Sequence, residues 1–201
     1  MRIVIDGTAG CGKTTFLQGK ADEDSMKEKY LNIQDLGHEV FLELIRGAIY
    51  IRKKKSKDPF DDWDDFFDIV LERGADFYNQ ARDESLLYFY DRGIPYLKIM
   101  ALRYGCTIPK KYYEYCERYR YDCPVFVFEP LKSYDDLKSQ QANPIRKRGY
   151  TLEERLAQHK KVMLLYEELG YEVVEVPVFV DGDPAENNKL RMKYISEYIK
   201  L

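Results

Sequence analysis

Residues 1–16 of the chain read MRIVIDGTAGCGKTTF. A short apolar run, Ile-Val-Ile, leads into the spacing G-x-x-x-x-G-K-[ST], which extends from Gly7 to Thr14. Residues without a Cβ atom let the backbone curl, so that several N–H groups point inward at one phosphate group. This spacing predicts a strand, a phosphate-binding loop and a helix in succession.

The residues of this loop are suited to hold a nucleoside triphosphate with Mg²⁺. Lys13 adds a positive charge, and a helix that begins near Lys13 directs its positive dipole end to the same place. The Thr14 hydroxyl is placed to coordinate Mg²⁺. A glycine-rich turn without function is the alternative, but the apolar run stands where phosphate binding requires a strand. Contacts to the nucleotide are expected from Gly7, Gly10, Cys11, Gly12, Lys13, Thr14 and Thr15.

Composition limits the class of protein. With 201 residues, 45% of them hydrophobic, the chain can bury a sizeable core, and one domain over residues 1–201 is the simplest expectation. A net charge of −3 argues against a surface built mainly for nucleic acid. No apolar stretch approaches the ~20 residues of a membrane span, so no membrane partner is expected.

The cysteines indicate a compartment. They form no CxxC pair and no zinc-type spacing with histidine, and nothing resembling a signal peptide precedes the first apolar run. We therefore expect a cytoplasmic protein with reduced thiols. The four cysteines are Cys11, Cys106, Cys116 and Cys123.

Short apolar runs recur along the chain, with helical spacing between them. After the first run they are EVFLE (39–43), SLLYFYD (85–91), CPVFVFEP (123–130) and YEVVEVPVFV (171–180). Continuously apolar strands that alternate with helices indicate a parallel sheet covered on both faces. We predict a three-layer α/β fold with about five parallel strands.

A charged stretch in the first third of the chain precedes a predicted helix. Asp58 can cap this helix and Pro59 can occupy its first position. Lysines followed by aspartates are typical of a solvated loop before an acidic first helical turn. The alternative is an insertion that contacts the substrate, with Trp63 as a stacking ring. Helical spacing on a core-facing stripe is seen at Phe60, Trp63, Phe67 and Val70.

The stretch LLYFYDRGIPY, residues 86–96, supplies a second candidate part of the site. Its apolar run places Asp91 at the carboxyl end of a strand, the edge at which ligands bind in open α/β sheets. There Asp91 can hold Mg²⁺ through water. Arg92 can contact the phosphate or acceptor group of a second substrate in a geometry that lysine cannot copy. Asp-Arg-Gly also forms ordinary strand-to-helix turns, and that interpretation stays open.

Glu43 is a candidate general base. It follows the apolar run from Val40 to Leu42, so it too is expected at the carboxyl end of a strand. A carboxylate in this place can accept a proton from an acceptor hydroxyl during phosphoryl transfer. If a helix begins here, Glu43 and Arg46 share a face and form an ordinary surface pair instead.

A basic stretch, NPIRKRGYTLEER (143–155), suggests a lid near residues 131–150. Thr151 and Glu154 predict a capping box at the start of the following helix. A mobile cationic segment can close over phosphates and neutralise charge in the transition state, and a solvated loop is the alternative. The candidate lid residues are Arg148, which is preferred, followed by Arg146 and Arg155.

Four stretches together resemble a family of predicted AAA-type P-loop ATPases that includes ribosylnicotinamide kinase domains. They are GTAGCGKTT, LELIR, YDRGIP and LYEELGYEVVEVP, and they span nearly the whole chain. The resemblance implies a P-loop NTPase fold like that of nucleotide kinases, with ATP and Mg²⁺ as ligands. Thymidylate and deoxynucleoside kinases share the broad arrangement. On the matching positions it implies phosphate and Mg²⁺ contacts for Lys13 and Thr14, a reaction centre at Asp91 and Arg92, and Glu43 as base.

The chain departs from this family at one position. Where the family usually continues D-R-G-I-P-D, this chain has Tyr96 in place of the second aspartate. A carboxylate that binds a ribose or base hydroxyl is thus replaced by a ring with one phenolic OH. The departure concerns the acceptor pocket and leaves the phosphate-binding residues unchanged.

Two classes of function fit these residues. The first is an ATP-dependent kinase acting on a nucleoside- or nucleotide-like acceptor. A related acceptor is DNA, as for phage-type P-loop kinases that phosphorylate hydroxymethyl pyrimidines. The second class is a regulatory ATPase whose output is a conformational change. A compact chain with a candidate base and a basic segment favours transfer, and ATP is favoured by the resemblance, since no N-K-x-D guanine motif is present.

Overall fold

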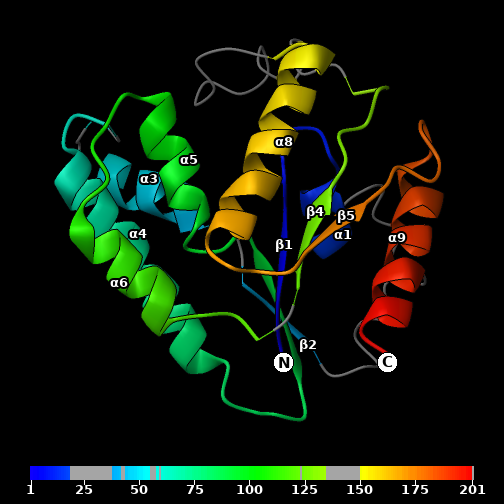
Figure 1. Ribbon diagram of the computed structural model, residues 1–201, viewed down its shortest axis with the longest axis horizontal. Coiled ribbons are helices and arrows are strands. Elements are labelled where there is room, and N and C mark those ends of the chain that lie inside the picture. Colours follow the sequence, from blue (N-terminus) through cyan, green and yellow to red (C-terminus); the bar gives the residue numbers. More distant parts are fainter. Residues whose placement is uncertain are drawn as a thin grey trace.

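The centre of the molecule is a parallel sheet of five strands in the order β2-β3-β1-β4-β5 (Figure 1). The computed structural model describes residues 1–18, 38–41, 44–54, 58, 60–122, 124–134 and 150–200. All four strand pairs are parallel, as the alternation of apolar runs predicted. The strands are β1 (Arg2–Gly7), β2 (His38–Phe41), β3 (Leu87–Asp91), β4 (Val125–Phe128) and β5 (Val173–Val176).

The strands are apolar on both faces because helices cover both faces. Successive side chains point to opposite sides of a strand, so Ile3 and Ile5 of β1 belong to one hydrophobic cluster and Val4 to another. The first cluster is covered by α1 (Lys13–Gln18) and α9 (Pro184–Tyr198), and the second by α8 (Leu152–Glu168). The predicted three-layer α/β fold is therefore confirmed.

The remaining helices form a group beside α8 on the left of the view, while α9 lies on the right (Figure 1). In this group α3 packs on α4, α4 packs on α6, and α5 contacts α8. Their bounds are α3 (Leu44–Lys54), α4 (Trp63–Gln80), α5 (Tyr96–Arg103) and α6 (Lys110–Arg118). None of the helices in the described ranges is long and apolar enough to cross a bilayer.

Helix α4 begins later than the sequence predicted. Its N-cap is Asp62, whose carboxylate accepts a hydrogen bond from the Asp65 backbone N–H at 3.1 Å. Asp58 does not cap the helix, because its own carboxylate accepts from the Phe60 N–H at 2.8 Å and closes a separate turn. Arg52 holds that turn by donating to the Asp58 and Asp62 carbonyls at 3.2 Å and 3.0 Å.

The charged stretch before α4 has a packing role in the described residues. The fully buried Arg52 forms ion pairs with Asp61 and Asp65. The centroids of the Trp63 and Tyr104 rings lie 5.2 Å apart, and Trp63 packs on the core. These contacts favour packing over ligand stacking for Trp63, while residues 55–57 and 59 lie outside the described part of the chain.

The start of α8 follows the sequence prediction. Thr151 Oγ1 accepts from the Glu154 N–H at 3.2 Å, and Glu154 Oε2 accepts from the Thr151 N–H at 2.9 Å. This reciprocal capping box satisfies two N–H groups that a helix start otherwise leaves unpaired. It fixes the start of α8 at Leu152, directly after the predicted lid in the sequence.

Candidate functional site

The candidate site lies at the carboxyl edge of the sheet, where β1 and β3 end side by side. Ile5 pairs in register with Asp91, and the Arg92 N–H donates to the Ile5 carbonyl at 3.0 Å. Since β1 lies between β3 and β4, its end also marks the point at which the strand order reverses, which is where open α/β sheets bind ligands. The fold thus brings the glycine-rich loop and the Asp-Arg-Gly segment together.

The loop after β1 has a backbone that only glycine adopts easily. The φ angles of Gly10 and Gly12 are 69° and 88°, in the left-handed region. A Cβ atom on Gly10 would lie 1.9 Å from Cδ1 of Tyr134, so the ring closes directly over the loop. Helix α1 begins at Lys13, as predicted, and the loop therefore fits the cradle that a phosphate chain requires.

Lys13 lies buried against the loop. Its ammonium donates to the Gly7 carbonyl at 2.8 Å and the Thr8 carbonyl at 3.2 Å, and it lies 3.5 Å from Cys11 Sγ. The positive charge is thus held against the backbone of the loop. The Thr14 side chain lies outside the described side chains.

Arg191 supports the loop from α9 and has no counterpart among the residues selected from the sequence. Its side chain is fully buried and donates to the carbonyls of Cys11, Glu129 and Pro177, the last two at 3.0 Å and 3.2 Å. Its guanidinium carbon also lies 4.4 Å from the centre of the Phe128 ring. Burial lowers the pKa of Arg191. Nothing in the local sequence marks it, because an arginine in a helix is ordinarily a surface residue.

Asp91 is buried at the end of β3, with 3% of its surface exposed. Strand alternation puts it on the face of Phe89, which is the face that α1 covers. A carboxylate and a threonine hydroxyl are oxygen ligands of the kind Mg²⁺ accepts, with waters and phosphate oxygens completing its shell. Within the described ranges, no three His, Cys, Asp or Glu side chains form a metal-binding group by themselves.

Asp6 is a fully buried carboxylate that the sequence analysis did not select. It faces α8, where its Oδ2 accepts from the Tyr166 hydroxyl at 2.7 Å, and its Oδ1 lies 3.6 Å from Arg92 Nε. Burial raises the pKa of Asp6, and the charges of Arg92 and Lys13 oppose that rise. The sequence contains the pattern that would have selected Asp6, because Asp6 ends the apolar run RIVID in the same way that Asp91 ends LLYFYD.

Arg92 is held in an unusual conformation. Its φ of 67° lies in the left-handed region, which costs a non-glycine residue about 1–3 kcal/mol. Its guanidinium carbon lies 4.0 Å from the centre of the Tyr96 ring. Tyr96 is buried and accepts from Gln158 Nε2 at 3.3 Å through its hydroxyl. The ring therefore supports Arg92 on one face.

Residues 131–134 cover the phosphate loop. The Leu131 N–H donates to the Gly10 carbonyl at 3.1 Å. Arg155 of α8 donates to the carbonyls of Leu131 and Tyr134, both at 2.9 Å, and only 2% of its surface is exposed. Arg155 thus anchors the beginning of the predicted lid segment from within the fold.

Three expectations fall outside the described residues. Glu43 lies between β2 and α3, and Arg146 and Arg148 lie between Tyr134 and Tyr150. The side chain of Arg46 is also outside the described side chains. Their roles remain predictions from the sequence.

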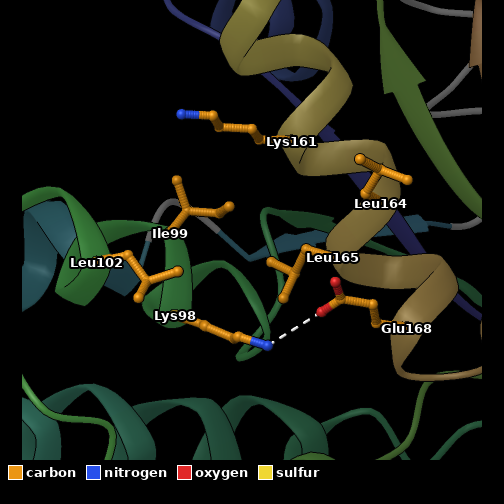
Figure 2. Close-up of a pocket in the computed structure, with 7 residues that line it drawn as sticks. All are labelled: Lys98, Ile99, Leu102, Lys161, Leu164, Leu165 and Glu168. Atoms are coloured by element: carbon orange, nitrogen blue, oxygen red, sulfur yellow. Dashed lines mark hydrogen bonds and ion pairs between the residues drawn. The ribbon is translucent and has the colours of Figure 1, made fainter.

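A surface pocket of about 370 Å³ lies between α5 and α8 (Figure 2). Lys98 Nζ and Glu168 Oε2 form an ion pair across it at 3.1 Å. Its lining includes no residue of the phosphate loop or the Asp-Arg-Gly segment. The lining residues are Lys98, Ile99, Leu102, Lys161, Leu164, Leu165 and Glu168.

Comparisons with known proteins concern the family and the fold. A family model described as an AAA domain matches residues 2–186. The fold is similar to that of the YorR protein from Bacillus subtilis, crystallised in complex with phosphorylated GDP, with a TM-score of 0.52 and 9% identity over 100% of this chain and 98% of that one. At this identity the likeness shows the fold alone. A search of curated proteins gave no match.

Proposed function

Because the chain belongs to the AAA domain family, we propose that it is a P-loop kinase, which transfers the γ-phosphoryl group of ATP to a nucleoside- or nucleotide-like acceptor. One observation carries the proposal: the phosphate loop, the buried Asp91 and the half-buried Arg92 meet at the ends of the adjacent strands β1 and β3. A phosphate loop by itself accounts only for binding of the nucleotide. A second charged group beside it supports chemistry at the terminal phosphate.

The donor side of the reaction is assigned to the loop and to Asp91. The loop N–H groups and Lys13 would hold the phosphate chain, while Thr14 and Asp91 would hold Mg²⁺. When bound, Mg²⁺ neutralises charge on the phosphate oxygens. The buried position of Lys13 supports this assignment, since a charge shielded from water acts more strongly.

The acceptor side is assigned to Arg92, Glu43 and Arg148. An acceptor hydroxyl attacks the γ-phosphorus, its proton passes to the Glu43 carboxylate, and the bond from phosphorus to the ADP oxygen breaks. Arg92 orients the acceptor or the transferred group through its planar guanidinium. Arg148, in the basic stretch after residue 134, neutralises charge as the lid excludes water.

The proposal is tested by accounting for all the phosphate. The full-length protein is incubated with ATP and Mg²⁺, and ADP, free phosphate and phosphorylated acceptor are measured in parallel. The acceptor panel contains nucleosides, nucleotides and hydroxymethylated DNA. For a kinase we expect slow ATP hydrolysis alone and ADP formation that rises by orders of magnitude with one acceptor class.

Each alternative has its own outcome in this assay. Phosphorylation of DNA alone would move the acceptor to hydroxymethyl pyrimidines. Free phosphate in proportion to ADP with every acceptor would assign the chain to regulatory ATPases and reject the kinase.

Arg92→Lys is the informative variant: it should raise the acceptor KM or lower transfer while ATP affinity stays nearly unchanged, since a bidentate contact becomes a point charge.

A further inference from the structure

The buried carboxylate of Asp6 has no part in the roles assigned above. It lies at the carboxyl end of the central strand, beside the loop that holds phosphate, and no part of the residue is exposed. A buried charge is costly unless it is paired and hydrogen-bonded. Its partners therefore indicate why the fold keeps it there.

Those partners come from the Asp-Arg-Gly segment, from α8 and from the start of the phosphate loop, where the Gly7 N–H donates to Asp6 Oδ1 at 2.6 Å. Asp6 Oδ1 forms an ion pair with Arg92 Nε across 3.6 Å. The Tyr166 hydroxyl donates to Asp6 Oδ2 at 2.7 Å and accepts from the Gly93 N–H at 3.4 Å. One phenol from α8 thus contacts the carboxylate and the backbone next to Arg92.

Arg92 is consequently fixed from several directions. The Ile5 carbonyl holds its backbone N–H at 3.0 Å, Asp6 holds the Nε edge of its guanidinium, and the Tyr96 ring lies 4.0 Å from its guanidinium carbon. These contacts counter the strain of its left-handed backbone. Because 13% of its side-chain surface is exposed, Arg92 still reaches the edge of the site.

We propose that Asp6 and Tyr166 are positioning residues that hold the Arg92 guanidinium in place at the acceptor side of the phosphate loop. They act through Arg92 and touch neither substrate. The benefit to phosphoryl transfer rests on the proposed function. The positioning itself does not, because it concerns contacts within this chain.

The test follows the Arg92 Nε proton in the ¹⁵N-labelled full chain by NMR, with Arg92→Lys used to assign the resonance. Asp6→Asn removes the charge at constant shape, and Tyr166→Phe removes only the hydroxyl. We expect exchange of this proton with solvent to become roughly tenfold faster in both variants, since the negatively charged ion-pair partner or the residue that supports it is lost. Affinity for MgATP, measured by calorimetry, should stay within about threefold of wild type.

Tyr171→Phe is the matched control. Tyr171 is a buried tyrosine whose ring lies 5.7 Å from that of Tyr166, but its hydroxyl accepts from the Tyr121 N–H at 3.5 Å and does not contact Asp6. It should leave the Arg92 proton unchanged. If Asp6→Asn fails to fold, Tyr166→Phe decides alone.

The positioning role is overturned if the Arg92 proton exchanges at the wild-type rate in folded Tyr166→Phe or folded Asp6→Asn. It is also overturned if Tyr171→Phe has the same effect, because the change would then reflect general loosening of the core. Neither result depends on transfer to an acceptor. A chain that never phosphorylates an acceptor but shows the expected exchange rates would reject the kinase and retain the positioning.

Discussion

Asp6 and Asp91 lie at the carboxyl ends of the neighbouring strands β1 and β3, and they face opposite sides of the sheet. Asp91 shares the face of α1, where the phosphate loop continues, whereas Asp6 faces α8 and bonds to Tyr166. Both are buried, so their charges act through a medium that screens them weakly. We therefore assign two roles to the same residue type at two strand ends: the proposed role of Asp91 is toward Mg²⁺, and that of Asp6 is toward Arg92.

The raised pKa of Asp6 predicts a pH dependence. Because burial raises this pKa above 3.8, the folded protein holds the proton more tightly than the unfolded chain. The stability that Asp6 contributes is therefore fully present below pH 3.8 and is lost as pH rises through the folded-state pKa. The free energy of unfolding of wild type, minus that of Asp6→Asn, should fall as pH rises above 3.8.

Denaturant unfolding of both proteins over a series of pH values measures this difference. Asp76→Asn, which removes an exposed carboxyl of α4, controls for the loss of a carboxyl without burial. A difference that increases with pH would mean that Asp6 is stabilised as a carboxylate, and the assigned effect of burial would be wrong.

Asp91→Asn should separate nucleotide binding from chemistry. The substitution keeps the shape of the side chain but removes the charge proposed to organise Mg²⁺. We expect a modest loss of MgATP affinity and a loss of transfer of about 10²-fold or more. Calorimetry and single-turnover kinetics provide the two quantities. Equal losses in both would indicate a structural role for Asp91.

Individual elements were predictable where the signal is local. The five apolar runs gave the five strands, and Thr151 with Glu154 gave the start of α8. The start of α4 was misplaced, because Asp58 and Asp62 are both competent caps and contacts with Arg52 from α3 select between them. The choice between two possible N-caps depends on contacts with a residue of another helix, and the sequence around the caps does not reveal it.

The contact between the phosphate loop and Tyr134 provides a test at the level of elements. Gly10 and Gly105 have nearly equal φ angles, 69° and 68°, but an added Cβ meets the Tyr134 ring at 1.9 Å in the first case and nothing within 4 Å in the second. Gly105→Ala should therefore cost only the left-handed strain, about 1–2 kcal/mol. Gly10→Ala should cost about 1–3 kcal/mol more, because the ring must move.

A double-mutant cycle with Tyr134→Ala isolates the clash. Chemical denaturation should show that the extra cost of Gly10→Ala largely disappears in the Tyr134→Ala background. If the extra cost persists there, the ring does not press on the loop and residues 131–134 do not cover it.

The assembly of the site as a whole was only partly predictable. The sequence placed Asp91 and Arg92 at a strand end, but the order β2-β3-β1-β4-β5 that sets β3 beside β1 comes from long-range pairing. The supporting residues Arg191 and Tyr166 come from α9 and α8, more than 150 residues from their partners Cys11 and Asp6. The burial of Arg191 and Tyr166 depends on the complete fold, and no sequence motif predicts it.

The proposal that this chain is a kinase is tested most directly by a single-turnover experiment. Wild-type protein in excess over ATP labelled in the γ-phosphoryl group is mixed with Mg²⁺ and the acceptor panel, and Lys13→Ala and Lys98→Ala are run beside it. Lys98 is the control, because it pairs with Glu168 in the α5–α8 pocket and takes no part in the site. We expect the label to appear in a nucleoside- or nucleotide-like acceptor with wild type and Lys98→Ala, and to remain in ATP with a folded Lys13→Ala. Label released only as free phosphate with every acceptor, or equal transfer by Lys13→Ala, would contradict the proposal.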